Sequence, residues 1–185
     1  MRAVVYRGRE DLDITDLAEP PVGPGEVRLR VGFNGICGSD LHEYFAGPIF
    51  IPNGQAHPLT GRELPLTLGH EFSGTVVELG PGVEGVAGGD GVEGAAEGDR
   101  VAVTPLYYCG TCPACAEGRY NVCAQIGFHG LMAYGGMAET TVVPQHMLHR
   151  LPDRVSLEMG ALVEPMAVAH HAAKLGDVTP DSTTG

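Results

Sequence analysis

The chain has 185 residues, 43% of them hydrophobic and 28 of them glycine, which suits one folded core with a small appendage and is short for two full domains. Acidic residues number 23 against 11 basic ones, so the formal net charge is -12 at pH 7. Such a field repels phosphate backbones and anionic membrane surfaces, so neither nucleic acid nor a membrane is an expected partner. No segment approaches the roughly 18 consecutive apolar residues of a membrane span, and the chain is expected to be soluble.

The first half of the chain predicts short β-strands separated by turn residues. Residues 26–33 (EVRLRVGF) alternate polar and apolar side chains with a period of two, which indicates a half-buried strand of an antiparallel sheet. Residues 19–25 are rich in proline and glycine, which end strands and form tight turns. The other expected strands comprise residues 2–6, 12–17, 74–79, 100–104 and 138–143.

A short helix is expected at residues 39–45, directly after Cys37. Either Ser39 or Asp40 could serve as its N-cap, because hydroxyl and carboxylate oxygens accept hydrogen bonds from the free amides of a first helical turn.

The clearest helix begins at Ser156, near the end of the chain. Pro165 is expected to break this helix, because proline lacks a backbone donor and clashes with the preceding turn. A second helix is then expected to begin at Pro165 and to end near Lys174 and Gly176. This arrangement would leave Glu164 extended, immediately before a helix N-terminus.

A tandem repeat occupies residues 82–99, where GVEGVAGGD is followed at once by GVEGAAEGD. The two copies match at seven of nine positions and have no apolar periodicity. They therefore predict a duplicated surface loop with little chemical role, and deletion of one copy should be tolerated.

Four of the five cysteines lie within fifteen residues, and their spacing predicts a metal site. Four thiolates satisfy the tetrahedral preference of Zn²⁺ and leave no position open, which is typical of a structural zinc. Turn residues between them predict that this lobe is a loop and not a helix. A pair of disulfides is the alternative, but it requires an oxidising compartment, and residues 1–17 lack a signal-peptide core. The expected ligands are Cys109, Cys112, Cys115 and Cys123.

A second zinc site could form from residues that are scattered along the chain. A catalytic zinc takes about three protein ligands from cysteine, histidine and carboxylate and keeps one position open. Cys37, His70, Glu71 and Glu164 could supply such a set. The alternative for Cys37 is a small buried hydrophobic residue, which is the usual role of a lone cysteine.

Several motifs in fixed order make the chain resemble the zinc-dependent medium-chain dehydrogenase/reductase (alcohol dehydrogenase) family, specifically its N-terminal GroES-like catalytic domain. An insert at residues 47–65 is similar to that of the 2,3-butanediol dehydrogenase branch. The motifs are GICGSDLH (35–42), GHEFSGTVVELGPGV (69–83), the four-cysteine lobe, GGMAE (135–139) and ALVEPMAVAHHA (161–172).

The resemblance implies a mainly β fold, namely a partly open GroES-like β-barrel with a structural-zinc lobe and a few short helices. The catalytic domain would cover residues 1–178, with the lobe at about 105–127, followed by a polar tail at 179–185. The protein is expected to be cytoplasmic, and the resemblance implies that full-length relatives are homo-oligomeric.

The resemblance also implies a reaction. A zinc-bound alkoxide of a secondary alcohol such as 2,3-butanediol would transfer hydride to NAD or NADP, and the reverse reaction would reduce a ketone. The catalytic zinc would be held by Cys37 and His70, with Glu71 or Glu164 completing the site directly or through water. Ser39 and His42 match the residues that relay the alcohol proton. The alternatives are a helix cap for Ser39 and a solvated surface histidine for His42. The remaining six histidines are interpreted as structural.

No segment of this chain predicts a binding site for the nicotinamide cofactor. A Rossmann domain needs a strand, a glycine-rich turn and a helix, and residues 80–98 lack that context. The last residues, DVTPDSTTG, stand where the first Rossmann strand would be expected. The chain is therefore expected to be either the catalytic half of a dehydrogenase, completed by a partner chain with a Rossmann domain, or a truncated and inactive zinc-binding module. In either case, residues 161–173 should expose an apolar face.

Overall fold

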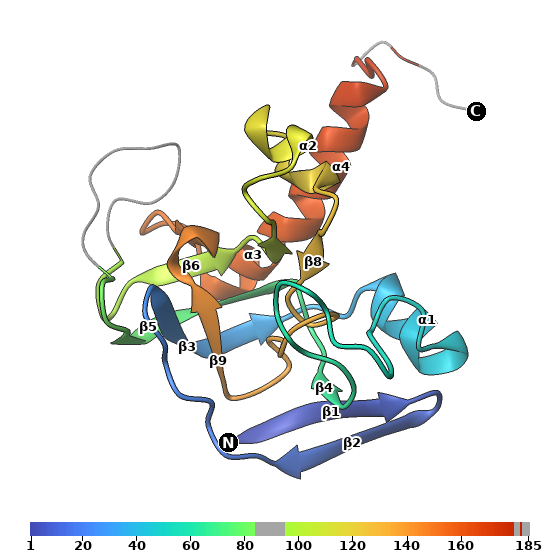
Figure 1. Cartoon of the computed structure of the whole chain (residues 1–185). Helices are drawn as coiled ribbons and strands as arrows, with labels where there is room; N and C mark the ends of the chain where they lie inside the picture. Colours follow the sequence, from blue (N-terminus) through green and yellow to red (C-terminus); the bar gives the residue numbers. More distant parts are fainter. Residues whose placement is uncertain (84–94, 180–181, 183–185) are drawn as a thin grey trace.

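The computed structural model describes residues 1–83, 95–179 and 182, and its centre is a five-stranded antiparallel sheet (Figure 1). The strand order is β10-β6-β5-β3-β9. The two longest members, β3 and β5, pair along nearly their whole length. The strands comprise β3 (Glu26–Asn34), β5 (Phe72–Leu79), β6 (Arg100–Val103), β9 (Thr140–Pro144) and β10 (Leu148–Arg150).

Two smaller sheets complete the β structure. One has the order β2-β1-β4, and the other pairs β7 with β8. The six strands predicted from the sequence match β1, β2, β3, β5, β6 and β9, although their ends differ by up to two residues. The chain therefore has the mainly β fold that the motifs imply. The smaller strands are β1 (Arg2–Gly8), β2 (Asp11–Asp16), β4 (Leu66–Thr67), β7 (Leu106–Tyr107) and β8 (Gly127–Phe128).

The core lies against these sheets in two clusters of apolar side chains. In β3, Val27 and Leu29 are buried, as the alternating pattern predicts, but Arg28 between them is buried as well. Its guanidinium forms ion pairs with Glu19 and Glu78, which compensate part of the cost of burying the charge. The larger cluster includes Val27, Leu29, Phe72, Val76, Val101, Val143 and Leu148, and the smaller one Tyr6, Ile51, Leu66, Leu68 and Leu131.

Helix α1 (Gly38–Ala46) begins directly after Cys37, which is its N-cap. The prediction that Ser39 or Asp40 caps this helix is therefore wrong, because both residues lie within its first turn. The Asp40 carboxylate instead reaches back and accepts a hydrogen bond of 2.9 Å from the backbone amide of Cys37.

Helices α3 (Leu157–Ala161) and α4 (Val163–Leu175) meet at Leu162, three residues before the predicted break. Ser156 caps α3 as expected, since its hydroxyl accepts a hydrogen bond from the Met159 amide. Pro165 lies in the first turn of α4, where its missing N–H would have no helical partner anyway, so the proline does not end the helix. The prediction that Glu164 is extended is wrong, because Glu164 is helical.

The four-cysteine lobe contains two short helical turns, α2 (Pro113–Ala116) and the 3-10 turn η1 (Tyr120–Val122). The prediction of a lobe without helix is therefore wrong. Pro113 occupies the first position of α2, where proline's fixed φ angle and missing donor favour a helix start. A second 3-10 turn, η2 (Gln145–Met147), joins β9 to β10.

The tandem repeat lies partly outside the described residues, at 84–94. Its last part does not follow the prediction of a simple surface loop. Ala95 is only 6% exposed and belongs to the larger core cluster. Asp99 accepts hydrogen bonds from the Ala96 amide and from the Arg150 side chain, so the end of the second copy is anchored to the sheet.

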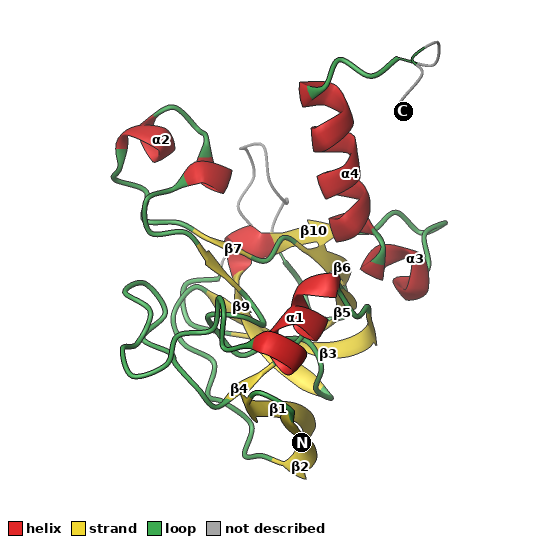
Figure 2. Cartoon of the chain, turned by 90° about the vertical axis from the view of Figure 1, so that its right-hand side faces the viewer, coloured by secondary structure: helices red, strands yellow, loops and turns green. Residues whose placement is uncertain are grey.

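Helix α4 extends away from the sheets in both views (Figures 1 and 2). None of its residues is buried, and its exposed apolar side chains include Val163, Met166, Val168 and Leu175. The expected apolar face at residues 161–173 is therefore present in this chain. Among the described helices, none is long and apolar enough to cross a membrane.

Candidate zinc sites

Three of the four residues predicted to hold a catalytic zinc come together at the start of α1. One ligand atom each from Cys37, His70 and Glu71 lies within 4.8 Å of the others. Cys37 is the N-cap of α1, whereas His70 and Glu71 follow β4 and directly precede β5. The sharp turn before His70 requires glycine, because Gly69 has a φ of +101° and a side chain there would collide with Met137 and Asn34.

Ser39 lies beside this cluster. Its hydroxyl oxygen is 3.3 Å from Nε2 of His70. His42 is one helical turn further along α1 and is exposed to solvent. Residues three apart lie on the same face of a helix, so Ser39 and His42 are on one side of α1.

Asp40 is a further residue of this site, one that the sequence interpretation treated only as a possible cap. Its Oδ1 atom lies 3.7 Å from Nδ1 of His70, and both side chains are buried. Burial raises the pKa of the Asp40 carboxyl, whereas the hydrogen bond from Cys37 opposes this shift. The signal in the sequence was an acidic residue three positions after a cysteine that begins a helix.

Glu164 approaches the cluster but is not within the tight group. Burial raises the pKa of its carboxyl to about 7, and the negative charge of Glu71 adds to the shift. Glu71 itself packs against Gly35, and a side chain at Gly35 would collide with the Glu71 carboxylate. Two carboxylates near one thiol and one imidazole form an environment in which a bound cation would relieve their repulsion.

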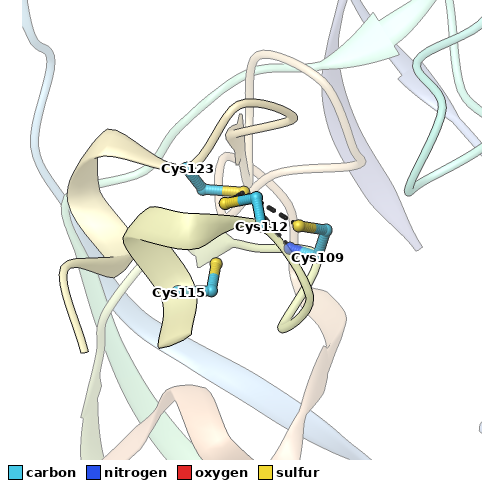
Figure 3. A group of neighbouring side chains, drawn as sticks. All are labelled: Cys109, Cys112, Cys115 and Cys123. Atoms are coloured by element: carbon cyan, nitrogen blue, oxygen red, sulfur yellow. Dashed lines mark hydrogen bonds between the residues drawn. The ribbon is translucent and has the colours of Figure 1, made fainter. Parts of the chain in front are cut away.

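The four cysteines of the lobe form the second cluster (Figure 3), with all four sulfur atoms within 4.8 Å of one another. The sulfur of Cys123 is 3.5 Å from that of Cys109 and 4.0 Å from that of Cys112. A tetrahedral zinc with bonds of about 2.3 Å would separate its sulfur ligands by about 3.8 Å, close to these values. None of the five cysteines forms a disulfide.

Backbone amides favour the thiolate form in part of the lobe. Hydrogen bonds from Thr111, with a further one from the Cys112 amide, lower the pKa of the Cys109 thiol to about 6. Amides of Cys109 and Gln125 also donate to the Cys123 sulfur, each at 3.3 Å. By contrast, burial raises the pKa of Cys115 to about 12. A bound cation would reverse that shift, because it stabilises a coordinating thiolate.

Comparison with known proteins decides the family. The profile of the family described as the alcohol dehydrogenase GroES-like domain matches residues 23–153, well over half of the chain. The chain belongs to this family.

Its relatives are alcohol and polyol dehydrogenases. The (R,R)-butanediol dehydrogenase of Bacillus subtilis (strain 168) is 45% identical over 175 residues, which cover 94% of this chain and 47% of the relative. The crystal structure of 2R,3R-butanediol dehydrogenase from Bacillus subtilis superposes with a TM-score of 0.82 over 94% of this chain and 46% of the other. An alcohol dehydrogenase from E. coli CFT073, solved in complex with NADH, superposes with a TM-score of 0.79 and 32% sequence identity, over 99% of this chain and 48% of the other.

This GroES-like domain therefore spans about half the length of the relatives that it matches. A protein from Sinorhizobium meliloti 1021 that is described as a zinc-binding dehydrogenase, solved with bound NADP, is also similar, with 31% identity and a TM-score of 0.76 over 94% of this chain and 45% of the other. Both cysteine-containing clusters of this chain lie within the matched residues, whereas Glu164 and α4 lie beyond them.

The six remaining histidines of the GroES-like domain lie outside both clusters. Nε2 of His57 is 3.1 Å from the Ile126 carbonyl, and Nε2 of His149 is 2.7 Å from the Thr104 hydroxyl. His146 packs edge-on against Tyr108. His129 is buried between Tyr107 and Thr141, and only His170 and His171, on α4, are exposed without such contacts among the described residues.

Proposed function

We propose that this chain is the zinc-binding catalytic domain of an NAD(P)-dependent dehydrogenase that oxidises a secondary alcohol such as 2,3-butanediol to the ketone, or catalyses the reverse reaction. The observation that carries the proposal is the convergence of Cys37, His70 and Glu71 at the N-terminus of α1. One sulfur, one nitrogen and one oxygen donor leave a tetrahedral ion with an open position, which is the pattern of a catalytic rather than a structural zinc.

The surroundings of His70 support the same assignment. Its buried Nδ1 has no hydrogen-bond partner, and neither does the nearest Asp40 oxygen, 3.7 Å away. A small rotation of either side chain would pair them and leave Nε2 directed at the ion. Histidine ligands of metals commonly donate their other ring nitrogen to a carboxylate, which fixes the tautomer and the orientation of the ring.

Cys37 and His70 would hold the ion, and Glu71 would be the third ligand because it belongs to the tight group. Glu164 would be the second carboxylate of the site, close enough to Glu71 to feel its charge. When bound, zinc would supply a Lewis acid that polarises the oxygen of the alcohol or ketone. Ser39 would accept the alcohol proton, since its hydroxyl lies 3.3 Å from Nε2 of His70, beside the candidate ligands, and the exposed His42 would pass that proton to solvent.

The four-cysteine cluster would hold a second, structural zinc. All four positions are filled by sulfur, so no substrate could reach the ion, and its role would be to hold the lobe together. The two helical turns α2 and η1 are too short to be stable alone, which makes a metal centre the reasonable source of their stability.

The nicotinamide cofactor would be bound by residues outside this chain, in a Rossmann domain that covers α4. The exposed apolar side chains of α4 support such a contact, because single-domain surfaces rarely present several large apolar groups on one element. A hydride donor must be held close to the carbinol carbon, and that positioning is a major part of the rate enhancement.

Metal analysis tests the proposal. The purified chain should bind two zinc ions, one for each cluster, and Cys37→Ser should bind only one. Cys112→Ser should also bind only one zinc ion, because it loses the ion of the four-cysteine cluster. If the wild type and Cys37→Ser both held a single zinc, the catalytic site would be refuted. Oxidation of 2,3-butanediol with NAD by the isolated chain would show that no separate Rossmann domain is required. A chain that binds both zinc ions but stays inactive when a Rossmann domain is supplied would be an inactive zinc-binding module.

A further inference from the structure

A cavity of about 190 Å³ lies apart from both cysteine clusters. Its walls come from segments that are distant in the sequence: the proline-rich connection before β3, the loop that contains Leu59 and Arg62, strand β7, and the loop after β8. None of the candidate zinc ligands lines it. It is smaller than the 300–1,000 Å³ typical of drug-sized pockets, so only a small molecule would fit.

The inner part of this cavity is polar, fixed and uncharged. His129 is only 1% exposed, with Nδ1 at 3.1 Å from the Tyr107 hydroxyl and Nε2 at 2.9 Å from the Thr141 hydroxyl. Burial lowers the pKa of His129 to about 3 and raises the pKa of Tyr107, so the imidazole is neutral and the phenol is protonated at neutral pH. The Tyr107 hydroxyl has both a proton and lone pairs, so it retains hydrogen-bonding capacity beyond its contact with His129.

The outer part of the cavity carries one cation and one carboxylate. The Arg62 guanidinium lies over the Tyr134 ring, 4.6 Å from its centre, and this contact holds the planar group in place. No carboxylate in the described part of the chain lies within ion-pair distance of Arg62. The Glu26 carboxylate lines the same cavity and uses one oxygen to accept a hydrogen bond from the Gly23 amide, which leaves the other oxygen as an acceptor.

This set of groups selects among small ligands by charge and by hydrogen bonding. A phosphate with two negative charges would find only one cation, Arg62, and would be repelled by Glu26 more strongly than a ligand with a single negative charge. A neutral diol would leave the planar donors of Arg62 without the carboxylate that they bind best. A short monocarboxylate with a neighbouring hydroxyl satisfies both groups, because the hydroxyl can donate to Glu26 or to Tyr107.

The geometry points to a binding site for a small 2-hydroxycarboxylate, with the carboxylate on Arg62, the hydroxyl on Glu26 or Tyr107, and the short carbon chain against Pro20, Leu59 and Val142. These apolar side chains line the remaining wall. The site does not depend on the proposed dehydrogenase reaction, since it shares no residue with the candidate catalytic cluster.

Three ligands with the same three-carbon chain test this proposal on the full chain. Lactate carries both groups, propionate lacks the hydroxyl, and 1,2-propanediol lacks the charge. Titration of each into isotope-labelled protein, followed by the backbone amide resonances of Thr60 and Ala133, would measure binding at the cavity. Lactate should give saturable shifts. The affinity for propionate should be about 3- to 10-fold lower, because a neutral hydrogen bond is lost. The affinity for 1,2-propanediol should be at least about 10-fold lower, because a charged hydrogen bond is lost. Inorganic phosphate should not saturate these resonances.

Variants assign the binding to Arg62 and separate it from the zinc site. Arg62→Gln should weaken lactate binding at least about 10-fold, whereas Arg62→Lys should retain part of it because one charge remains. Arg9→Gln is the matched control, since Arg9 is exposed and does not line the cavity. Cys37→Ser should leave the lactate-induced shifts at Thr60 and Ala133 unchanged. Lactate that binds to a zinc ion would depend on Cys37, whereas lactate in the cavity would not.

Several results would overturn the proposal. They are equal affinity for lactate and 1,2-propanediol, the absence of saturable shifts at these two amides, and unchanged lactate binding in Arg62→Gln. The ligand series on the wild type remains decisive even if Arg62→Gln fails to fold, because it requires no variant.

Discussion

The buried carboxylate of Asp40 lies 3.7 Å from Nδ1 of His70 and also accepts a hydrogen bond from the backbone amide of Cys37. One side chain thus touches both residues that we propose as the cysteine and histidine ligands of the catalytic zinc. We expect Asp40→Asn to weaken zinc binding at this site by about 10- to 100-fold, because an amide no longer supports the imidazole as a charged acceptor. The measurement is competition for zinc with a chelator of known affinity.

Asp13→Asn is the control for this experiment. Asp13 is an exposed residue of β2 whose carboxylate lies 3.9 Å from the Arg7 guanidinium. It belongs to neither cluster, so its substitution should leave both zinc sites unchanged. Equal zinc affinities for Asp40→Asn and the wild type would show that Asp40 does not position His70.

Gly35 determines how closely Glu71 can approach the cluster. A side chain at Gly35 would collide with the Glu71 carboxylate, whereas a side chain at Gly38 would meet no atom within 4 Å. We therefore expect Gly35→Ala to displace Glu71 and to reduce zinc affinity at the catalytic site by about 10-fold or more, with the four-cysteine site unaffected. Gly38→Ala should bind zinc like the wild type, and equal losses in both variants would rule out a specific effect on Glu71.

The exposed apolar side chains of α4 should cause self-association when the chain is expressed alone. Met166 and Val168 are 64% and 60% exposed. The double substitution Met166→Glu and Val168→Glu should shift the protein toward a monomer in sedimentation or light-scattering experiments, because charged groups resist burial in a contact. Lys174→Glu alters the charge of the same helix without removing apolar surface and should not have this effect. A wild-type chain that is monomeric and does not bind a hydrophobic dye would contradict the prediction.

Acid should destabilise the folded chain partly through His129. Burial holds the pKa of His129 at about 3, compared with 6.5 for an unperturbed histidine. Between these values the unfolded chain binds a proton that the folded chain does not, so stability falls as the pH decreases below about 6.5. At pH 5, this residue should lower the free energy of unfolding by about 2 kcal/mol.

Denaturant unfolding between pH 5 and pH 7 would measure this contribution. His129→Gln should be less stable at pH 7, because its hydrogen bonds to Tyr107 and Thr141 are altered, but its stability should depend less on pH. In His171→Gln, on the exposed face of α4, the free energy of unfolding should depend on pH as steeply as in the wild type. The same slope in His129→Gln and the wild type would refute the assignment.

The repeat offers a deletion with a defined expectation. Removal of residues 82–90 leaves the second copy, so Ala95 can still enter the core and Asp99 can still bind Arg150. The shortened chain should have a melting temperature close to that of the wild type, since these contacts of the second copy are retained. Removal of residues 95–99 should instead lower it, because a core residue and an anchoring ion pair are lost. Unfolding of the 82–90 deletion would show that the first copy is structural.

Local patterns in the sequence predicted much of this protein. Period-two alternation located β3, because successive side chains of a strand point to opposite faces of the sheet. The cysteine spacing predicted a four-sulfur cluster, because ligands in one short loop cannot be far apart. Strands of two or three residues, such as β4 and β10, were missed because they contain too few residues to show a period.

The tertiary structure decided which of the scattered residues meet. Cys37 and His70 are 33 positions apart, and only the pairing of β3 with β5 brings the segments that follow and precede these strands together. The same packing placed Asp40 against His70 and kept Glu164 outside the tight group. It also allowed Pro165 to stay within α4, because a helix that begins at Val163 leaves the first-turn amides free. The residue types therefore predicted the chemistry from the sequence alone, whereas the distances between them depended on long-range packing that no local pattern records.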